Sequence, residues 1–152
     1  MGNVVVRCAS EADLDALLSL YAELAGSKIT AAPADRASAE PLLAEIFADP
    51  RRELAVAIVE GQVVGTADLI VISNLTHRGE PWAIVENVIV ADGARRAGVG
   101  RALFEHLLEV ARTAGCHKLQ LLSGKHRAEA HAFYRSMGLD AIAEGFKIYF
   151  DE

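Results

Sequence analysis

The chain has 152 residues, of which 52% are hydrophobic, and a formal net charge of −6 at pH 7. This length and apolar content suffice for the core of one globular domain, so we expect a single domain spanning residues 1–152. A negative net charge is unlike the positive charge typical of proteins that bind nucleic acids. Because neither a membrane span nor a signal peptide can be read from the sequence, we expect a cytoplasmic protein without membrane or nucleic-acid partners.

The acidic excess lies in the first half of the chain. Residues 1–76 contain 5 Lys and Arg against 11 Asp and Glu, whereas residues 77–152 contain 10 of each kind. The second half nevertheless includes a cluster of arginines. This division is consistent with one half handling a polyanionic cofactor and the other facing a cationic molecule.

The first third of the chain predicts a strand, a helix, a loop and a second helix. Val4–Val6 is a β-branched run, and Ser10 is a typical N-cap for a helix that ends near Gly26. Residues 28–39 predict a loop, and residues 39–48 carry apolar side chains at helical spacing. We expect this loop and its flanking helices to determine specificity for a substrate or partner.

The rest of the chain alternates between strands and helices. The predicted strands cover residues 54–60 and 63–72, joined by a turn at Gly61-Gln62, and residues 82–90, 117–122 and 146–150. The predicted helices cover residues 99–115 and 129–137. Mixed elements in this order predict an α/β or α+β fold around one central sheet.

A basic, glycine-containing loop precedes the helix at residue 99. Its sequence is Arg95-Arg96-Ala97-Gly98-Val99-Gly100-Arg101. Backbone N–H groups in the first turn of a helix lack intrahelical acceptors, and the helix dipole favours an anion there. Gly98 and Gly100 permit close approach to the main chain, and arginines add charged hydrogen bonds. The pattern therefore predicts an anionic cofactor, whose pyrophosphate could lie directly on the main chain.

Two motifs resemble those of the GNAT superfamily of N-acetyltransferases. Arg95-x-x-Gly98-x-Gly100 is similar to the family's [Q/R]-x-x-G-x-[G/A] acyl-CoA signature, and residues 130–139, AHAFYRSMGL, resemble its A-x-x-[FL]-Y-x-x-x-G-[FL] helix. The resemblance implies a mixed, largely antiparallel central sheet flanked by helices, and direct acetyl transfer from acetyl-CoA to a primary amine. A homodimer would be unsurprising for the family. The histidines show no metal-binding spacing, so we expect no metal.

The resemblance also implies site residues. Tyr134 is the candidate general acid that protonates the leaving thiolate, and Glu86, unusual in a strand of Val, Ile and Asn, is the candidate general base. The expected cofactor-binding residues are Val88, Ile89, Val90, Arg95, Arg96, Gly98, Val99, Gly100, Arg101 and Ala102. Backbone groups of residues 88–90 would bind pantetheine, and an exposed strand edge would distinguish this role from an ordinary buried strand.

Three further positions complete the predicted site. Arg127 stands where the family often has Asn, so it either reaches a cofactor phosphate or lies on the helix surface. Asn74 and His77, on the loop before the strand at residue 82, are candidate acceptor contacts.

Several functions stay open at this point. A small-molecule amine is the preferred acceptor, and a protein lysine or N-terminus is an alternative. A catalytically inactive acyl-CoA-binding sensor or interaction module, or a general nucleotide-binding protein, is the rival class. The presence of both Glu86 and Tyr134 argues against a sensor, because affinity alone requires no base and acid.

Overall fold

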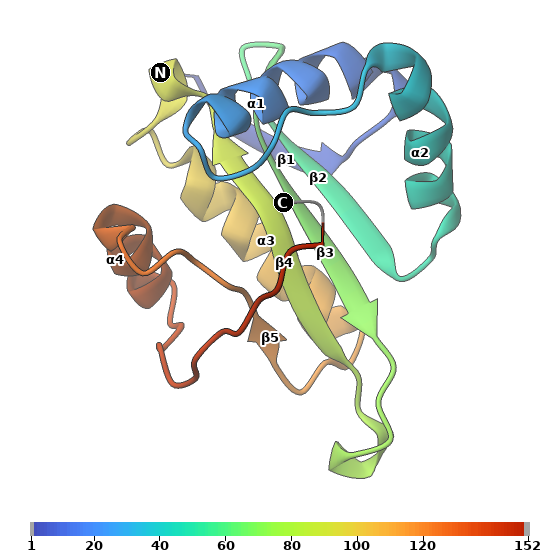
Figure 1. The fold of residues 1–152 in the computed structure, drawn as a ribbon, viewed down its shortest axis with the longest axis vertical. Helices are drawn as coiled ribbons and strands as arrows, with labels where there is room; N and C mark the ends of the chain where they lie inside the picture. The colour runs from blue at the N-terminus through green and yellow to red at the C-terminus, as the bar shows by residue number, and fades with distance from the viewer. Residues whose placement is uncertain (1, 151–152) are drawn as a thin grey trace. The chain divides into compact units, whose positions relative to one another are not determined.

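The computed structural model of the protein describes residues 2–150, which form two compact units (Figure 1). The larger unit ends at Gln120 and contains a five-stranded sheet with helices α1, α2 and α3. The smaller unit begins at Leu121 and contains helix α4. None of the helices in residues 2–150 combines the length and apolarity needed to cross a bilayer.

The sheet is largely antiparallel, as predicted. Strands β1 to β4 pair in chain order as antiparallel neighbours, and β5 adds to β4 in parallel. The strands are β1 Val4–Cys8, β2 Arg52–Val59, β3 Gln62–Ile72, β4 Trp82–Val90 and β5 Leu119–Gln120. The centres of β2 and β3 are buried because helices cover both of their faces.

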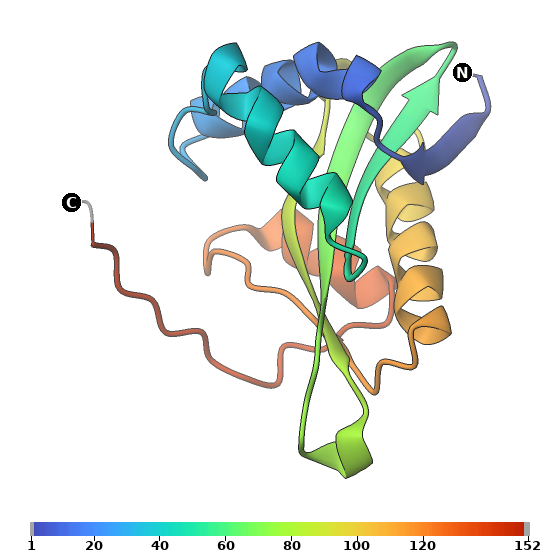
Figure 2. The same ribbon diagram turned by 90° about the vertical axis from the view of Figure 1, so that its right-hand side faces the viewer.

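Helices lie on both faces of this sheet (Figure 2). Helices α1 (Leu14–Gly26) and α2 (Arg36–Ala48) cover one face, and α3 (Val99–Thr113) covers the other. Helix α4 spans Ala128–Ser136 in the smaller unit. Single 3₁₀ turns cover Glu11–Asp13, His77–Gly79 and Asp92–Ala94.

Helix α3 packs on the sheet through one apolar stripe. Its buried residues are Val99, Leu103, Phe104, Leu107 and Ala111. The first turns of this stripe lie against Gly65 of β3. A Cβ at Gly65 would lie 3.1 Å from both Val99 Cγ1 and Leu103 Cδ1, and 3.3 Å from the Ile89 carbonyl oxygen. The missing side chain therefore allows the N-terminal end of α3 to sit close to the sheet.

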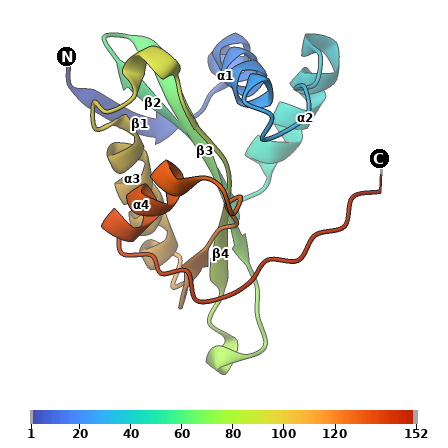
Figure 3. The same ribbon diagram turned by 60° about the vertical axis from the view of Figure 1, so that its left-hand side comes forward.

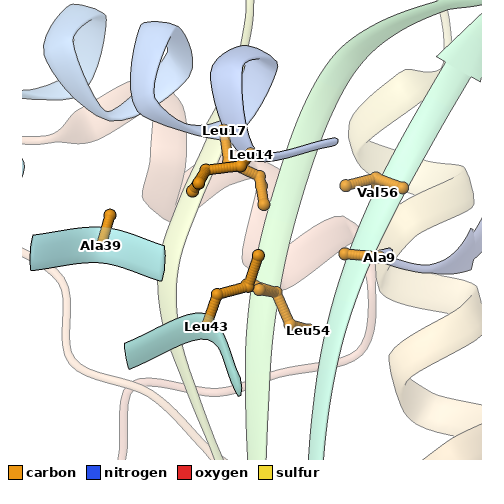
Figure 4. Close-up of a cluster of buried hydrophobic side chains, with 7 residues drawn as sticks. All are labelled: Ala9, Leu14, Leu17, Ala39, Leu43, Leu54 and Val56. Carbon is orange, nitrogen blue, oxygen red and sulfur yellow. The ribbon is translucent and has the colours of Figure 1, made fainter. Parts of the chain in front are cut away.

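On the other face, α1 and α2 enclose a second apolar cluster. Figure 4 shows Leu14 and Leu17 of α1 directed toward Leu43 of α2 and Leu54 of β2. The buried members of the cluster are Ala9, Leu14, Leu17, Ala39, Leu43, Leu54 and Val56. Full burial of one large apolar side chain is worth about 1.5–3 kcal/mol, so this cluster holds both helices on the sheet.

An ion pair fixes the turn that leads into α1. Ser10, the predicted N-cap, caps the 3₁₀ turn Glu11–Asp13, and α1 follows from Leu14. The Arg7 guanidinium donates hydrogen bonds of 2.7 and 3.0 Å to the buried Asp13 carboxylate, and the Ser10 backbone N–H donates to the same carboxylate at 2.7 Å. The hydrogen bonds from Arg7, and then those from Ser10, hold the pKa of Asp13 below its usual value against the opposing effect of burial.

Two predicted boundaries in the larger unit are wrong. The turn between β2 and β3 consists of Glu60 and Gly61 rather than Gly61 and Gln62, since these two residues have φ of +50° and +78°. A two-residue hairpin turn of type I′ requires positive φ at both positions. Helix α2 begins at Arg36 rather than Ala39, because the Asp35 carboxylate accepts a hydrogen bond from the Ser38 N–H at 2.9 Å and caps the helix.

Two predicted strands are also corrected. The strand expected over residues 117–122 is reduced to Leu119–Gln120, and the segment 146–150 forms no strand. In the smaller unit the chain after α4 runs without regular structure through residue 149 (Figure 3). A strand requires a hydrogen-bonded neighbour, which alternation of apolar residues does not supply. Phe146, Ile148 and Phe150 are accordingly exposed.

We expect Asp13→Asn to lower the free energy of unfolding by about 2 kcal/mol at pH 7, because it weakens charged hydrogen bonds to a buried group. A depressed carboxyl pKa stabilises the fold above the unfolded pKa of about 3.9, and this contribution is lost as the pH falls toward the folded value. Urea denaturation of both proteins should therefore show a difference that narrows below about pH 4. The exposed Glu11→Gln is the control. Equal stability of Asp13→Asn and wild type at pH 7 would contradict this account.

Candidate active site

Strand β4 contains a β-bulge. Its pairing with β3 passes from Glu86 opposite Asp68 to Ile89 opposite Thr66. Two residues of β4, Asn87 and Val88, therefore stand opposite a single residue of β3. Asn87 has φ of +52°, in the left-handed region that Asn adopts more readily than most side chains. The extra residue interrupts the ladder and bends the strand.

The bulge reverses which face of the sheet the side chains of β4 occupy before and after it. Val85 pairs with Leu69, on the face that α3 covers. Ile89 instead packs against Leu20 and Leu24 of α1, on the opposite face. Residues four apart in a regular strand would share a face. The extra residue therefore allows β4 to contribute to both layers of the core.

The outer edge of β4 is open beyond Ile84. Pairing with β5 is confined to Ala83 with Leu119 and Ile84 with Gln120. Within residues 2–150, no further strand pairs with this edge. The following backbone groups on that side are therefore not part of the sheet ladder, which is the condition for the predicted pantetheine contacts.

Of the three residues predicted to bind pantetheine, two direct backbone groups to this edge. The Ala91 N–H donates to a carbonyl of β3 at 2.8 Å, so alternation turns the backbone of Val90, and of Val88, away from β3. In agreement, the Val90 carbonyl accepts a hydrogen bond from Arg95 Nε at 3.2 Å. The carbonyl of Ile89 lies on the β3 side. The open edge thus offers Val88 and Val90, but not Ile89, to a ligand.

The glycine loop ends at the N-terminus of α3. Gly98 precedes the helix with φ of +80°, and the Ala102 N–H bonds to its carbonyl at 3.0 Å. Ala102 thus uses its N–H within the helix. The N–H groups of Val99, Gly100 and Arg101 come before the first intrahelical bond, and Gly98 supplies no side-chain cap. These three N–H groups are the predicted anion site.

The arginines of the loop are exposed, and two of them make weak ion pairs. Arg95 Nη1 lies 3.3 Å from Asp92 Oδ1, and its Nη2 lies 3.9 Å from Glu23 Oε1. Arg101 Nη1 lies 3.9 Å from a glutamate one turn further along α3. Arg96 adopts φ of +62° within the turn. Exposed pairs contribute about 0–1 kcal/mol, so a phosphate competes easily for Arg95 and Arg101.

Glu86 lies on the face of the sheet that α1 and α2 cover. It stands opposite Asp68, which shares this face with Thr66, and Thr66 is hydrogen-bonded to Tyr21 of α1. Asp68 is buried and receives hydrogen bonds of 2.5 and 3.0 Å from Arg52. Glu86 itself is exposed and forms no ion pair within the described part of the chain. Its carboxylate is therefore available for a proton or an ammonium group.

In the smaller unit, Tyr134 lies on α4. Its side chain is hydrogen-bonded to Arg127, the residue that precedes the helix. Burial raises the pKa of the Tyr134 phenol, and Arg127 opposes this effect. The phenol is therefore protonated near neutral pH, as a general acid must be. Arg127, for which the sequence left two roles open, has Tyr134 as a partner.

Asn74 and His77 lie at the other end of β4 from the glycine loop (Figure 1). Both belong to the connection that precedes Trp82, whereas the glycine loop follows Val90. The His77 ring stacks on the ring of His117, with 3.9 Å between centroids and 13° between planes. The structure therefore does not bring these two predicted acceptor contacts to the bulge. Nowhere in residues 2–150 are three or more potential metal ligands grouped as a metal site.

Sequence reasoning missed Asn87 and Tyr21. A cavity of about 290 Å³ lies between α1, α2 and the loop that joins them, and both residues line it. Burial, and then the Asp68 carboxylate, raise the pKa of Tyr21 to about 12, so its phenol is neutral. The available signal for Asn87 was its residue type, because Asn is depleted from strands and enriched at positive φ. Tyr21 looked like any apolar residue of a helix.

Comparisons with known proteins agree with this geometry. The family described as the acetyltransferase (GNAT) family matches residues 14–139. A glucosamine 6-phosphate N-acetyltransferase of Trypanosoma brucei brucei is 35% identical over 81 residues, which are 53% of each chain. The chain spans about half the length of the curated relatives it matches.

Two solved structures cover nearly the whole chain. A Trypanosoma brucei acetyltransferase, Tb11.01.2886, is 27% identical with a TM-score of 0.83, over 97% of this chain and 100% of the other. A transcriptional regulator from Bacillus halodurans C-125 is 32% identical with a TM-score of 0.87, over 97% and 100%. With the family match extending over residues 14–139, the open edge of β4 and the glycine loop at α3, the chain belongs to the GNAT family of acetyltransferases.

Proposed function

We propose that the protein transfers the acetyl group of acetyl-CoA directly to a primary amine of a small molecule. The observation that carries this proposal is the open edge of β4 at Val88 and Val90, followed in the chain by the uncapped N-terminus of α3. An extended amide arm requires a strand edge, and a pyrophosphate requires a cluster of N–H groups. The chain presents both within a short segment.

The glycine loop fits such a donor. Apart from Gly98 and its two chain neighbours, no described atom lies within 4 Å of the position that a Cβ of Gly98 would occupy, so the backbone is open to a close ligand. The N–H groups of Val99, Gly100 and Arg101 would bind the pyrophosphate. Arg95 and Arg101 would exchange their weak surface pairs for phosphate oxygens.

The proposed chemistry requires three proton transfers: two from the amine nitrogen and one to the departing thiolate. A primary amine is protonated near neutral pH, so Glu86, directly or through water, accepts its proton before the amine nitrogen attacks the thioester carbonyl. Acetyl-CoA supplies the activated acyl group: a C–N bond forms and the C–S bond breaks. Tyr134 donates a proton to the departing thiolate, the nitrogen gives up its second proton to the Tyr134 phenolate through water as the amide forms, and solvent then takes the proton from Glu86. The products are an amide and coenzyme A.

Membership of the GNAT family restricts the identity of the acceptor only to an amine. The relative from Trypanosoma brucei brucei is named for glucosamine 6-phosphate, which makes this amino sugar a necessary member of any acceptor panel. A protein amine is the alternative acceptor. An acyl-CoA-binding sensor would bind the donor and transfer nothing to any amine, and the experiments below separate it from an enzyme.

Calorimetric titration with acetyl-CoA tests the donor site. We expect saturable binding by the wild type and its loss in Gly100→Trp, because an indole at the first turn of α3 blocks approach to the N–H groups. Gly26→Trp is the control, since Gly26 is exposed at the end of α1 with open space around it. No binding by folded wild type would remove the transferase proposal and leave the fold unchanged.

Replacing the proposed base gives a pH-dependent effect. We expect Glu86→Gln to lower kcat/KM by about 10² or more near pH 7 and by less at high pH, where the amine loses its proton without help. Glu80→Gln, which removes a carboxylate from the β3–β4 connection, should leave the profile unchanged. For both variants, kcat/KM is measured as a function of pH by following the release of the free thiol of coenzyme A. A uniform decrease at every pH would mean that Glu86 is not the base.

Replacing the proposed acid separates turnover from binding. We expect Tyr134→Phe to lower kcat by about 10²-fold or more while the affinity for acetyl-CoA hardly changes. Tyr149→Phe, which alters an exposed tyrosine of the same unit, is the matched control. Steady-state kinetics and calorimetry supply the two quantities. Full turnover by Tyr134→Phe would exclude Tyr134 from the mechanism.

A further inference from the structure

We infer that the acceptor is a primary amine that carries a compact apolar group, such as an aromatic ring on a short alkyl chain, bound in the cavity between α1 and α2. The inference rests on the proposed acetyl transfer and names the substrate class. It follows from the lining of the cavity, its volume, its charge, and the place in its wall of Asn87, the residue next to Glu86.

The lining of the cavity is predominantly apolar. Leu14, Leu17 and Leu18 of α1 face Leu42, Leu43 and Ile46 of α2 across it. The polar side chains among the described lining residues are those of Tyr21, Thr30 and Asn87, and none of the lining side chains is charged. A ligand that fills this space therefore exchanges water for hydrocarbon over most of its surface.

The volume suits a ring with a linker. The cavity measures about 290 Å³. An apolar cavity of about 150 Å³ with a similar aliphatic lining holds benzene, so this one has room for an aromatic ring and a short chain. Ala31, Ala34 and Ala39 also line the cavity, and their small side chains leave space that larger side chains would fill.

Two polar residues of the lining lie close to the proposed base in the sheet or in the sequence. Asn87, the bulge residue that follows Glu86, lines the cavity. The cross-strand position of Glu86 puts it on the same face of the sheet as Tyr21. An amine whose apolar group occupies the space between α1 and α2 would therefore direct its nitrogen toward the proposed base.

The charge distribution disfavours a phosphorylated acceptor. Residues 1–76, which supply most of the lining, carry 11 Asp and Glu against 5 Lys and Arg. The nearby Arg52 is held by the buried Asp68, and Arg36 at the start of α2 pairs with Asp15 and Glu40. An ammonium group gains from this field, and a phosphate group is repelled by it.

The test uses the full chain, with 2-phenylethylamine and glucosamine 6-phosphate as acceptors. Thiol release from acetyl-CoA gives kcat/KM for each, and calorimetry without acetyl-CoA gives the affinity for 2-phenylethylamine. We expect kcat/KM to be at least tenfold higher for 2-phenylethylamine. A tenfold ratio corresponds to about 1.4 kcal/mol, less than full burial of one large apolar side chain contributes.

Three alanine substitutions locate the binding. Ala39→Leu and Ala34→Leu each place a larger side chain in the cavity wall, and Ala37→Leu makes the same change on an exposed position of α2 outside the lining. We expect the first two to raise KM for 2-phenylethylamine at least fivefold with unchanged acetyl-CoA affinity, and Ala37→Leu to resemble the wild type. Ala34 lies in the loop, so its variant remains informative should Ala39→Leu fail to fold.

The outcomes separate this inference from the proposed function. Preferred acetylation of glucosamine 6-phosphate, or unchanged kinetics in Ala34→Leu, would overturn the apolar acceptor and leave the transferase standing. Binding of 2-phenylethylamine that Ala34→Leu weakens, without acetyl transfer to any amine, would support the cavity as an apolar amine site and remove the transferase. Absence of both binding and transfer would overturn both.

Discussion

The arrangement of the larger unit depends on one extra residue in β4. Because Asn87 and Val88 together face a single position of β3, the strand leaves the regular ladder just after Glu86. Two consequences follow from this interruption. Ile89 turns to the α1 side of the sheet, and Asn87 reaches the wall of the cavity, while the backbone after the bulge lies at an edge that β5 does not reach. The proposed donor and acceptor sites thus share the geometry of one strand.

The sequence was most informative where chemistry and local backbone requirements coincide. The start of a helix at residue 99, with unpaired N–H groups after a glycine that leaves room for a ligand, could be read from the loop alone, whereas the φ of +80° at Gly98 was not predicted. The N-cap at Ser10 and the strands β1 to β4 followed from local patterns as well. These features depend on interactions within a few residues, which a single chain displays directly.

Features that depend on distant partners were not readable. The bulge exists only relative to the register of β3, so Asn87 looked like an ordinary strand residue. The cavity exists only because α1 and α2 meet over β2, and its leucines have the same spacing as a filled core. The aromatic and β-branched residues of 146–150 predicted a strand, yet composition alone cannot provide the neighbour that a strand needs. Asn74 and His77 were selected for proximity in sequence to β4, but they lie beside its other end.

Gly65 has no reactive group, yet the proposed donor site depends on it through the packing of α3. A Cβ there would lie 3.1 Å from side-chain atoms of both Val99 and Leu103, so these side chains or α3 would have to shift at the end where the glycine loop presents its N–H groups. In a saturation library selected for activity, codon 65 should thus be as depleted of substitutions as a catalytic codon, although Gly65 contributes no atom to the reaction. Loss of activity on substitution of Gly65 would therefore reflect the close packing of α3 on the sheet and not a direct role in catalysis.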